Sequence, residues 1–436
     1  MPIFDKDAEL MKRGEIRQLQ LERLQAIVFR CHKSVSFYRK KFENAALTPD
    51  DIQSLDDISR LPFTTKADLR DSYPYGMFAV PLREIVRIHS SSGATGLPTV
   101  VGYTRNDLKN WSVLCARIMF AAGVTADDVV QIAFDYGIFT GAFGIHQGAE
   151  RIGASVIPTS VGNTDRQIKI IQDYKTTALA CTPAYALGLA EKMAESGVDP
   201  NTTSLKIGLF GGEPWSESTR AKIEDKLFIR AMDNYGISEV LGPGVAGECE
   251  ARSGLHINED HFYAEIINPD TLEKLPDGVE GELVLTTLTK EGFPLIRYRT
   301  GDITKLNTEK CSCGRELARM SRVFCRADDT IIVRGINIYP ARVESLIKTP
   351  EGILPEYQII VENVDSQDQV QLLIEVTEEL FLDEMRRLRE YHLNLEKTLK
   401  ASLGLAIKAK LVEPKAIPRE GGSIKRIVDR RSNNSC

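Results

Sequence analysis

Between residues 129 and 212, short apolar runs alternate with longer segments whose apolar residues recur every three or four positions. The short runs are typical of buried strands, and the longer segments are typical of amphipathic helices. The expected strands are 129–136, 154–159, 178–183 and 205–212, and the expected helices are 165–175 and 184–197. Because strands that alternate with helices form parallel sheets covered by those helices, this pattern predicts an α/β fold with a largely parallel sheet.

The rest of the chain has a different pattern on each side of this region. Residues 6–45 repeat apolar positions at helical spacing and predict a helix. From about residue 255 the pattern changes to strand, turn and strand, which predicts a β-rich subdomain. Further on, a strand pair, a charged helix and another strand within 355–414 predict a smaller α/β module. A chain of 436 residues is long enough for two bodies, and we expect domains at 1–326 and 327–436.

Composition excludes several classes of function. The formal net charge is −6 and the pI is near 5.7, so the chain lacks the basic surface that a nucleic-acid partner requires. The first residues are charged and amphipathic, unlike a secretion signal, and no run reaches the roughly 18–20 apolar residues of a membrane span. We therefore expect a cytoplasmic protein without a membrane partner, whose eight cysteines are reduced thiols or metal ligands.

The segment SSSGATGLPT (90–99) combines hydroxyl side chains with two glycines, a composition that suits phosphate oxygens. It lacks the Gly-Lys-Ser/Thr ending of a P-loop, because Leu97 follows Gly96. The runs on both sides, 83–90 and 99–104, have strand character, so we expect the segment to join two strands rather than a strand and a helix. Such a loop can close over the terminal phosphates of ATP, and an ordinary turn is the open alternative.

Four further segments carry polar groups that ATP chemistry uses. NYGISE ends in Glu239, a hard oxygen ligand suited to Mg²⁺. YRTGD ends in Asp302, whose carboxylate can accept both hydroxyls of a ribose. RADDTIIVRGINIYPARVE (326–344) joins paired aspartates to a strand, a glycine turn and a helix start, and PREGGSIKR (418–426) is a basic loop with glycine. Alone, each segment is better explained as an ordinary loop or turn.

In this order and spacing, the five segments together resemble the adenylate-forming superfamily of acyl-CoA synthetases, adenylation domains and luciferases. Within it, residues 139–171, residues 211–220 and the tail VDRR are most similar to the phenylacetate–coenzyme A ligases, and the resemblance spans essentially the whole chain. It implies a large N-terminal body with mixed sheets, helices and a β-rich subdomain, and a smaller mobile C-terminal α/β domain. The implied enzyme converts a phenylacetate-like aryl acid and Mg-ATP into an acyl-adenylate, transfers the acyl group to coenzyme A, and forms a homodimer.

The resemblance also assigns a role to each motif. It implies that the pyrophosphate end of ATP is bound by Ser90, Ser91, Ser92, Gly93, Ala94, Thr95 and Gly96. It implies that the AMP part is bound by Gly212, Glu213, Pro214, Asn234, Tyr235, Gly236, Ile237 and Ser238. Glu239 corresponds to the Mg²⁺ ligand, Asp302 to the ribose ligand and Arg326 to an arginine that faces the nucleotide. Asp328 corresponds to the hinge, and Gly335 lies in the loop along the pantetheine tunnel of coenzyme A. The residues that correspond to the pocket for the aryl group of the acid are Tyr136, Phe139, Ala142, Gly211 and Ile237.

Two departures from the family pattern bear on activity. Leu97 replaces a lysine that the phosphate loop often carries, which removes one cation from the phosphates. Ser423 occupies the position of the catalytic lysine of the C-terminal domain. Because residues i and i+2 of an extended segment share a face, we expect Lys425 to replace it, with Glu239 and Arg326 as the other catalytic groups. Two alternatives stay open: an adenylating enzyme with an acceptor other than coenzyme A, and a non-catalytic nucleotide-binding protein.

A cysteine pair predicts a metal site. Cys311 and Cys313 are one residue apart in the polar stretch EKCSCGRE, and Cys249 and His256 lie upstream in ECEARSGLH. Three thiolates and one imidazole form the ligand set of a structural tetrahedral zinc site, and some members of the resembled family carry a similar cluster. Free thiols are the alternative, and Cys325 is a further candidate ligand. We expect a zinc ion that holds loops together without taking part in catalysis.

Overall fold

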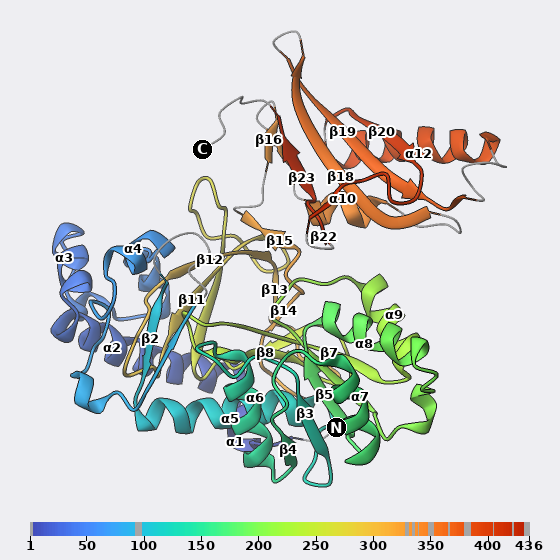
Figure 1. Ribbon diagram of the computed structural model, residues 1–436. Coiled ribbons are helices and arrows are strands. Elements are labelled where there is room, and N and C mark those ends of the chain that lie inside the picture. The colour runs from blue at the N-terminus through green and yellow to red at the C-terminus, as the bar shows by residue number, and fades with distance from the viewer. Residues whose placement is uncertain are drawn as a thin grey trace. The chain divides into compact units, whose positions relative to one another are not determined.

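The computed structural model describes residues 3–91, 98–327, 331–333, 336–338, 340–347, 353–364, 367–378, 385–403, 405–420 and 423–430. The chain forms two compact units (Figure 1). Unit 1 comprises Met1–Thr300 and Thr304–Arg322, and unit 2 comprises Gly301–Ile303 and Val323–Cys436. Each unit has an apolar core of its own, so each can be understood from its own strands and helices.

The N-terminal segment forms three helices, α1 (Lys6–Glu9), α2 (Arg13–Ser34) and α3 (Ser36–Asn44), so the expected single helix is wrong. The backbone takes extended angles at Lys12 (φ −68°, ψ 152°) and at Val35 (φ −115°, ψ 110°), which separates the helices. Val35 is nevertheless buried, so the apolar spacing continues through the second break. Periodicity alone therefore does not reveal where the backbone leaves the helix.

A nine-stranded sheet organises unit 1, in the order β13-β14-β9-β8-β7-β6-β5-β3-β4. Its members are β3 (Val129–Ile132), β4 (Ser155–Ile157), β5 (Ala178–Cys181), β6 (Ile207–Phe210), β7 (Arg230–Ile237), β8 (Gly242–Glu248), β9 (Leu255–Ile257), β13 (Leu306–Asn307) and β14 (Arg319–Met320). The strands from β4 to β7 run parallel, which confirms the four strands expected from the alternating pattern. From β7 to β13 the pairs are antiparallel, so the sheet is mixed rather than largely parallel.

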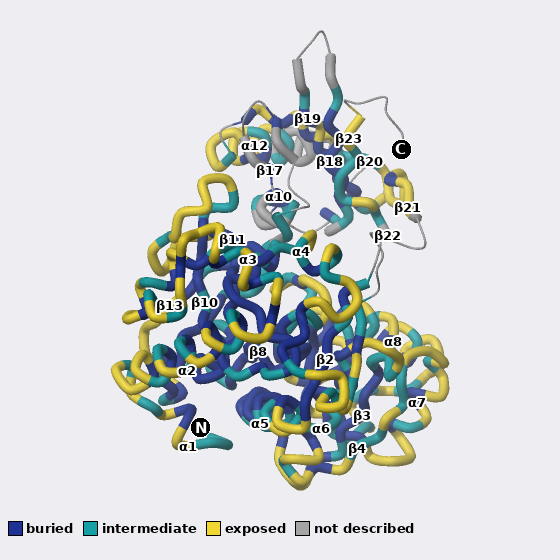
Figure 2. Tube along the Cα trace, turned by 90° about the vertical axis from the view of Figure 1, so that its left-hand side faces the viewer, coloured by how far each residue is buried: buried dark blue, intermediate teal, exposed yellow. Residues whose placement is uncertain are grey.

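Helices cover both faces of the parallel half of the sheet. One face carries α5 (Arg105–Ala121) and α6 (Gly141–Ile152), and the other carries α7 (Thr164–Asp173), α8 (Pro183–Glu195) and α9 (Glu217–Leu227). Strand β5 serves both cores, because Ala178 and Ala180 pack under α5 and α6 whereas Leu179 and Cys181 pack under α7 to α9. In Figure 2 the buried residues follow the strands, and the exposed residues lie on the outer helix surfaces and loops.

The β-rich region forms a second sheet in the order β10-β11-β12-β15, as the strand–turn–strand pattern predicts. Strand β10 (Phe262–Ile267) pairs antiparallel with β11 (Gly281–Thr287), and β12 (Tyr298–Thr304) pairs with β15 (Cys325–Arg326). Gly278 adopts φ +81° in the connection between β10 and β11, a backbone conformation that favours glycine.

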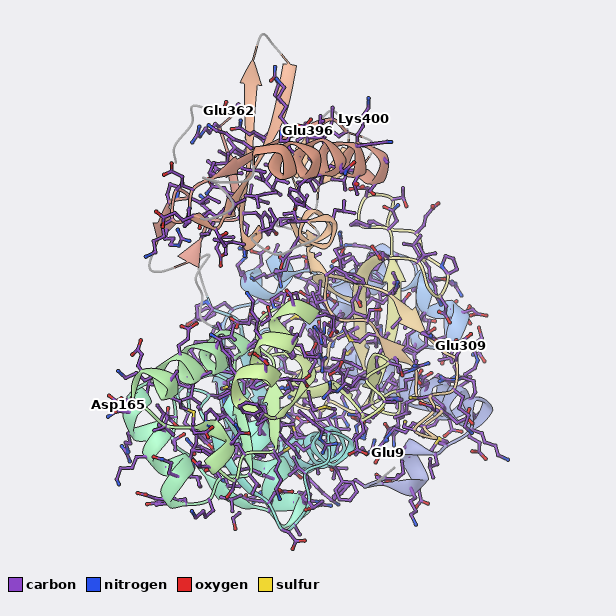
Figure 3. The ribbon with its side chains drawn as sticks, turned by 90° about the vertical axis from the view of Figure 1, so that its right-hand side faces the viewer. Glu9, Asp165, Glu309, Glu362, Glu396 and Lys400 are labelled. Carbon is purple, nitrogen blue, oxygen red and sulfur yellow. The ribbon has the colours of Figure 1, made fainter. Side chains whose placement is uncertain are left out.

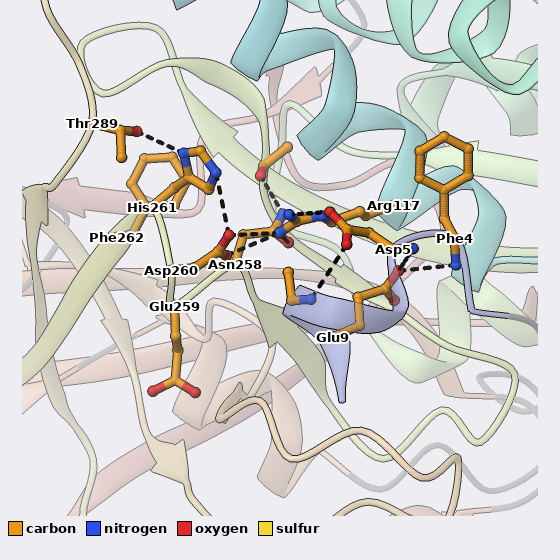
Figure 4. A network of polar contacts seen from close by, with 12 residues as sticks. Phe4, Asp5, Glu9, Arg117, Asn258, Glu259, Asp260, His261, Phe262 and Thr289 are labelled. Atoms are coloured by element: carbon orange, nitrogen blue, oxygen red, sulfur yellow. Dashed lines mark hydrogen bonds and ion pairs between the residues drawn. The ribbon is translucent and has the colours of Figure 1, made fainter. Parts of the chain in front are cut away.

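A buried network of charges fixes the N-terminal helix to α5 and to the turn between β9 and β10 (Figure 4). The Arg117 guanidinium contacts the two oxygens of Asp260 at 2.9 and 3.0 Å and Asp5 at 2.6 Å. His261 contacts Asp260 through Nε2 at 3.3 Å and the Thr289 hydroxyl through Nδ1 at 2.6 Å. Burial acts against the charge of Asp260, but hydrogen bonding to His261 and the Arg117 guanidinium hold its pKa below the usual value.

Unit 2 is built on a four-stranded sheet in the order β20-β19-β18-β23. Its elements are β16 (Ile331–Val333), β17 (Ile336–Ile338), α10 (Pro340–Leu346), β18 (Ile353–Val364), β19 (Gln367–Val376), α12 (Met385–Leu403), β20 (Ile407–Val412), β21 (Arg419–Glu420), β22 (Ser423–Ile424) and β23 (Ile427–Asp429). The expected strand pair, charged helix and following strand are therefore confirmed. Helix α12 buries Leu395 and Leu399 and carries Lys400 on its exposed side (Figure 3). Within the described ranges, none of the helices combines the length and the apolar character of a membrane span.

Candidate functional site

Three connections meet at the carboxyl ends of the parallel strands: the loop after β3, the loop after β6, and the end of β7 with its following turn. The Asn234 side-chain amide donates to the Phe210 carbonyl at 2.7 Å, and the Thr140 and Ser238 hydroxyls are 2.9 Å apart. Segments that the sequence assigns to the adenine, the Mg²⁺ and the acid thus lie at one edge of the sheet. Open α/β sheets bind ligands at this edge, so the arrangement suits a small-molecule site.

The loop after β6 contains the expected adenine segment, Gly211, Gly212, Glu213 and Pro214. A Cβ atom on Gly211 would lie 2.5 Å from the Asn234 carbonyl oxygen, so only glycine allows β6 and β7 to approach this closely. Gly212 adopts φ +83°, which also favours glycine. The exposed Glu213 carboxylate accepts a hydrogen bond from the Ala184 amide at 2.8 Å, at the N-terminus of α8. Because a carboxylate stabilises that end of a helix, Glu213 has a structural role as well.

Glu239 lies in the turn between β7 and β8 and is partly exposed. No described residue forms a hydrogen bond or an ion pair with its carboxylate, which leaves both oxygens available to a cation. The turn itself is held in place: a Cβ atom on Gly236 would lie 1.9 Å from the Gly242 carbonyl oxygen, and the buried Tyr103 donates its hydroxyl to the Leu241 carbonyl at 2.8 Å. The other expected residues of this strand and turn are the buried Tyr235 and the partly exposed Ile237 and Ser238.

A β-hairpin carries the expected phosphate segment, as predicted. Strand β1 (Arg87–Ser90) pairs antiparallel with β2 (Val100–Tyr103). Two hydrogen bonds of 3.0 Å continue the pairing, from the Ser91 amide to the Thr99 carbonyl and from the Thr99 amide to Ser91 Oγ. The remaining expected residues of this segment lie outside the described residues: Ser92, Gly93, Ala94, Thr95, Gly96 and the departure Leu97. The hairpin therefore fixes where the segment begins and ends.

The loop 133–140 contains two of the residues expected around the acid. Phe139 is 38% exposed, and the Tyr136 hydroxyl lies 2.9 Å from Nδ1 of His146 on α6. Burial raises the pKa of the Tyr136 hydroxyl, so this group stays protonated near neutral pH. Ala142, also expected at the acid, is fully buried in the core between α6 and the sheet.

Unit 2 holds three of the expected nucleotide and catalytic residues. Asp302 and Arg326 are register partners on β12 and β15, and their side chains form an ion pair at 3.1 Å. Asp302 is buried, whereas Arg326 is partly exposed. Lys425 follows β22 with an exposed side chain, and its carbonyl accepts from the Gln358 side-chain amide at 2.9 Å. The remaining expected residues, Asp328 and Gly335, lie outside the described residues.

The four predicted metal ligands converge on one buried point of unit 1: Cys249, His256, Cys311 and Cys313. Their ligand atoms all lie within 4.8 Å of one another. The Cys249 and Cys311 sulfurs are 3.9 Å apart, and the Cys313 sulfur is 3.4 Å from His256 Nε2. His256 Nδ1 lies 3.3 Å from the Leu317 carbonyl, which places the proton on Nδ1 and leaves the Nε2 lone pair toward the thiols. The side chain of the further candidate, Cys325, is not among those described.

A charged neighbour connects this cluster to the N-terminal helix. The Cys249 thiol, His256 and Arg315 hydrogen-bond to the Cys313 sulfur and hold the pKa of Cys313 well below its usual value. Arg315 Nη1 lies 3.5 Å from that sulfur, and Arg315 Nε donates to the Glu9 carboxylate at 2.5 Å. Helix α1 and the cluster are therefore held by the same guanidinium group.

Lys290 is a buried cation that sequence reasoning missed. The residue is 4% exposed, and its Nζ has no hydrogen-bond partner within the described part of the chain. The Nζ atom lies 3.1 Å from the centroid of the Tyr103 ring. Burial lowers the pKa of Lys290 to about 7, against the opposing effect of the Asp107 carboxylate. Because Tyr103 also bonds to Leu241, Lys290 packs behind the turn that carries Glu239.

Lys290→Met is expected to raise the free energy of unfolding at pH 7 by about 2–4 kcal/mol, because an apolar side chain avoids the desolvation of an ammonium group. In the wild type, the unfolded chain keeps a proton on Lys290 up to about pH 10.4, whereas the folded chain releases it near pH 7. The free energy of unfolding should therefore rise with pH across this window, and the variant should lack this contribution.

Chemical denaturation of both proteins between about pH 6 and 10 measures this effect. Lys169→Met serves as the control, because the Lys169 side chain is exposed on α7. The same pH dependence in the Lys290→Met variant and the wild type would contradict the prediction.

Trp215, directly after the adenine segment, contacts two guanidinium groups that sequence reasoning also missed. Arg220 lies 5.0 Å and Arg322 lies 4.4 Å from a ring of Trp215. Arg322, the last residue of unit 1, also pairs with Asp233 on β7 at 3.3 Å. Burial raises the pKa of Asp233 to about 7. These contacts connect the end of unit 1 to the segment that follows β6.

Two family profiles match the chain. The AMP-binding enzyme family matches residues 19–288, and the AMP-binding enzyme C-terminal domain matches residues 335–431. These two matches account for most of the chain and agree with the order of the motifs along it.

Curated proteins and solved structures give matches over almost the whole chain. A phenylacetate-coenzyme A ligase of Thermus thermophilus is 43% identical over 98% of this chain and 100% of its own length. The corresponding ligase of Aromatoleum evansii is 46% identical over 97% of this chain and 96% of its own length. A crystal structure of 2-hydroxyisobutyryl-CoA ligase with 2-HIB-AMP in the postadenylation state is 29% identical, with a TM-score of 0.85 over 99% of this chain and 94% of that chain.

Proposed function

Because the chain belongs to the phenylacetate–coenzyme A ligase family of AMP-binding enzymes, we propose that it activates a phenylacetate-like aryl acid with ATP and transfers it to coenzyme A. In the first half-reaction a carboxylate oxygen of the acid attacks the α-phosphorus of ATP, and pyrophosphate leaves. In the second, the thiol sulfur of coenzyme A attacks the acyl carbon, and AMP leaves. The supporting observation is identity of 43% and 46% to curated ligases over nearly the whole chain.

The polar groups at the sheet edge fit the first half-reaction. The carboxylate of Glu239 is suited to hold Mg²⁺, which neutralises charge on the phosphates when bound. Ser90, Ser91 and the segment that follows them bind the pyrophosphate end, and the bare backbone at Gly212 lets the adenine approach. For the ribose hydroxyls we propose the carboxylate of Asp302, which belongs to unit 2. Positioning and charge neutralisation then drive the displacement, and no covalent side-chain nucleophile is needed.

We assign the aryl group to the loop 133–140, with Tyr136 and Phe139 as its aromatic neighbours. Gly211 and Ile237 complete the pocket, since small and apolar residues leave room for a ring. Ala142 supports this pocket by packing α6 closely onto the sheet.

For the C-terminal part, we propose a domain at 327–436 that rotates near Asp328, with Gly335 along the path of the pantetheine arm. Arg326 faces the nucleotide beside its ion-pair partner Asp302. The exposed ammonium of Lys425 supplies the positive charge that assists adenylation, because Ser423 cannot.

A screen for pyrophosphate release over aryl and alkyl acids, with and without coenzyme A, tests the proposed function. We expect release with arylacetic acids, and a thioester product only when coenzyme A is present. Release without a thioester would favour a different acceptor. No release with any acid would identify a nucleotide-binding protein that does not catalyse this reaction.

Lys425→Ala is expected to lower the rate of adenylate formation by about 100-fold, because a cation at the reacting phosphate is lost. Thioester formation from synthetic acyl-adenylate should stay within about three-fold of the wild type, since it does not need that cation. Lys408→Ala, at an exposed position of β20, is the matched control. Pyrophosphate exchange measures the first step, and full exchange activity in Lys425→Ala would show that the assignment is wrong.

We further propose that the Cys249, His256, Cys311 and Cys313 cluster holds a structural zinc ion. The chemistry of the donors supports this: three sulfurs and one imidazole nitrogen, all buried, lie within 4.8 Å of one another. The bond from His256 to Leu317 already orients the imidazole for a metal. Since the protein would fill all four positions, the ion would hold loops together and leave none open for a substrate.

The cellular setting and the assembly are proposals of the same kind. Both co-substrates of the proposed reaction, ATP and coenzyme A, are used in the cytoplasm, which supports a cytoplasmic enzyme. The family resemblance supports a homodimer.

A further inference from the structure

One backbone oxygen joins the expected phosphate hairpin to the expected acid loop. The carbonyl of Ile138, in the loop 133–140, accepts a hydrogen bond from the Ser90 amide at 2.9 Å. His89 Nδ1 lies 3.1 Å from the same oxygen. Because a carbonyl only accepts, a neutral His89 carries its proton on Nδ1 and donates it to Ile138. The strand that enters the phosphate segment is thus tied to the acid loop through both a backbone and a side-chain donor.

The His89 ring is buried and tightly packed. It is 3% exposed and packs among aromatic rings, with centroid distances of 5.5 Å to Tyr103, 5.9 Å to Trp111 and 5.3 Å to Phe143. Burial lowers the pKa of His89, so the imidazole stays neutral. Its Nε2 has no hydrogen-bond partner among the described residues. The bond to Ile138 is therefore a polar contact through which this ring holds the acid loop.

The same loop is bonded at its other end to the segment of the expected magnesium ligand. The Thr140 hydroxyl lies 2.9 Å from the hydroxyl of Ser238, the residue before Glu239. A Cβ atom on Gly242 would lie 2.7 Å from Thr140 Cβ, so the loop also packs tightly against the start of β8. This short loop, itself assigned to the acid, therefore contacts the segments assigned to the triphosphate and to Mg²⁺.

We propose that His89 is a positioning residue that couples the binding of the acid to the placement of the triphosphate. This inference rests on the proposed function. An acid that orders the loop 133–140 also orders, through the Ile138 carbonyl, the strand that enters the phosphate segment. Such coupling is reciprocal, so bound ATP should strengthen acid binding by the same factor. In-line attack on the α-phosphorus is sensitive to small displacements, so loss of this anchor should lower kcat.

Two amide side chains distinguish the two nitrogens of the ring. Asparagine can place an N–H at the position of Nδ1, whereas glutamine reaches the position of Nε2, which has no partner here. His89→Asn should keep kcat of acid-driven pyrophosphate exchange within about three-fold of the wild type. His89→Gln and His89→Leu should lower it by about ten- to hundred-fold.

A second measurement reports the coupling itself. In the wild type and in His89→Asn, the KM for ATP should fall several-fold as the acid concentration rises to saturation. In His89→Gln and His89→Leu, the KM for ATP should no longer depend on the acid. A residue that only packs would not produce this difference between asparagine and glutamine.

Thermal unfolding of each variant separates lost packing from lost coupling. If His89→Asn and His89→Leu lose exchange activity equally, in proportion to their lost stability, His89 is only a packing residue and the proposal is overturned. It is equally overturned if the KM for ATP in the wild type does not depend on the acid. Exchange by the wild type supports the proposed function whatever the variants do, and no exchange by the wild type would reject that function and this inference together.

Discussion

Glu239→Gln is expected to lower the rate of acyl-adenylate formation by about 100- to 1000-fold. The substitution keeps the size of the side chain but replaces a charged oxygen ligand by a neutral amide, which binds Mg²⁺ weakly. No described residue forms a hydrogen bond or an ion pair with this carboxylate, so its loss leaves no protein group without a partner. The effect should therefore appear in catalysis and not in folding, and pyrophosphate exchange over a range of Mg²⁺ concentrations measures it.

Two further variants sharpen this test. Glu239→Asp keeps the charge on a side chain shorter by one methylene, so part of the activity should return as Mg²⁺ is raised. Glu195→Gln removes an exposed carboxylate at the end of α8 and should behave like the wild type. If Glu239→Gln kept exchange within about three-fold of the wild type, the proposed magnesium ligand would have to be sought elsewhere.

Cys313→Ser is expected to release zinc and to lower the thermal unfolding midpoint by about 5 °C. This is the shift that follows when a chain of this size loses a ligand present at about 1,000 times its dissociation constant. A serine hydroxyl does not ionise near neutral pH and is a poor zinc ligand. Arg315 links the Cys313 sulfur to Glu9, so amide hydrogen exchange in helix α1 should increase as well. Metal analysis and thermal unfolding of the purified protein measure both losses.

Cys115→Ser is the matched control for this variant. Cys115 is also buried, lies outside the cluster, and donates to the Pro243 carbonyl, a bond that serine can keep. Its zinc content should equal that of the wild type. Wild-type protein with far less than one zinc per chain would contradict the four-ligand proposal. A Cys313→Ser protein of normal stability that cannot catalyse would contradict the structural role.

The parts of the fold that followed from sequence are those whose pattern is local. Strands β3, β5 and β6 are short apolar runs buried on both faces, and such runs stand out between polar helix surfaces. Strand β8 has the sequence GPGVAGE, which is too rich in glycine to carry a strand pattern. It forms because Gly236 and Gly242 let two backbones approach, a contact between segments that no single window contains.

The residues of the candidate site also divide into those that the sequence could predict and those that it could not. Glu239, the hydroxyl-rich hairpin and the Cys-x-Cys pair can be found in sequence because residue type and spacing already suit a ligand. His89 and Lys290 could not be found, since their roles depend on what surrounds them. His89 matters through one carbonyl of a distant loop, and Lys290 through its burial behind Tyr103. In a single sequence, neither differs from an ordinary surface histidine or lysine.

Helix α1 is anchored to the interior of unit 1 through two carboxylates. Asp5 and Glu9 supply carboxylates to the buried guanidinium groups of Arg117 and Arg315, and the second of these touches the Cys313 sulfur. Removing these residues would deprive two buried cations of an anion each, and one of them, Arg315, contacts the proposed metal ligand Cys313.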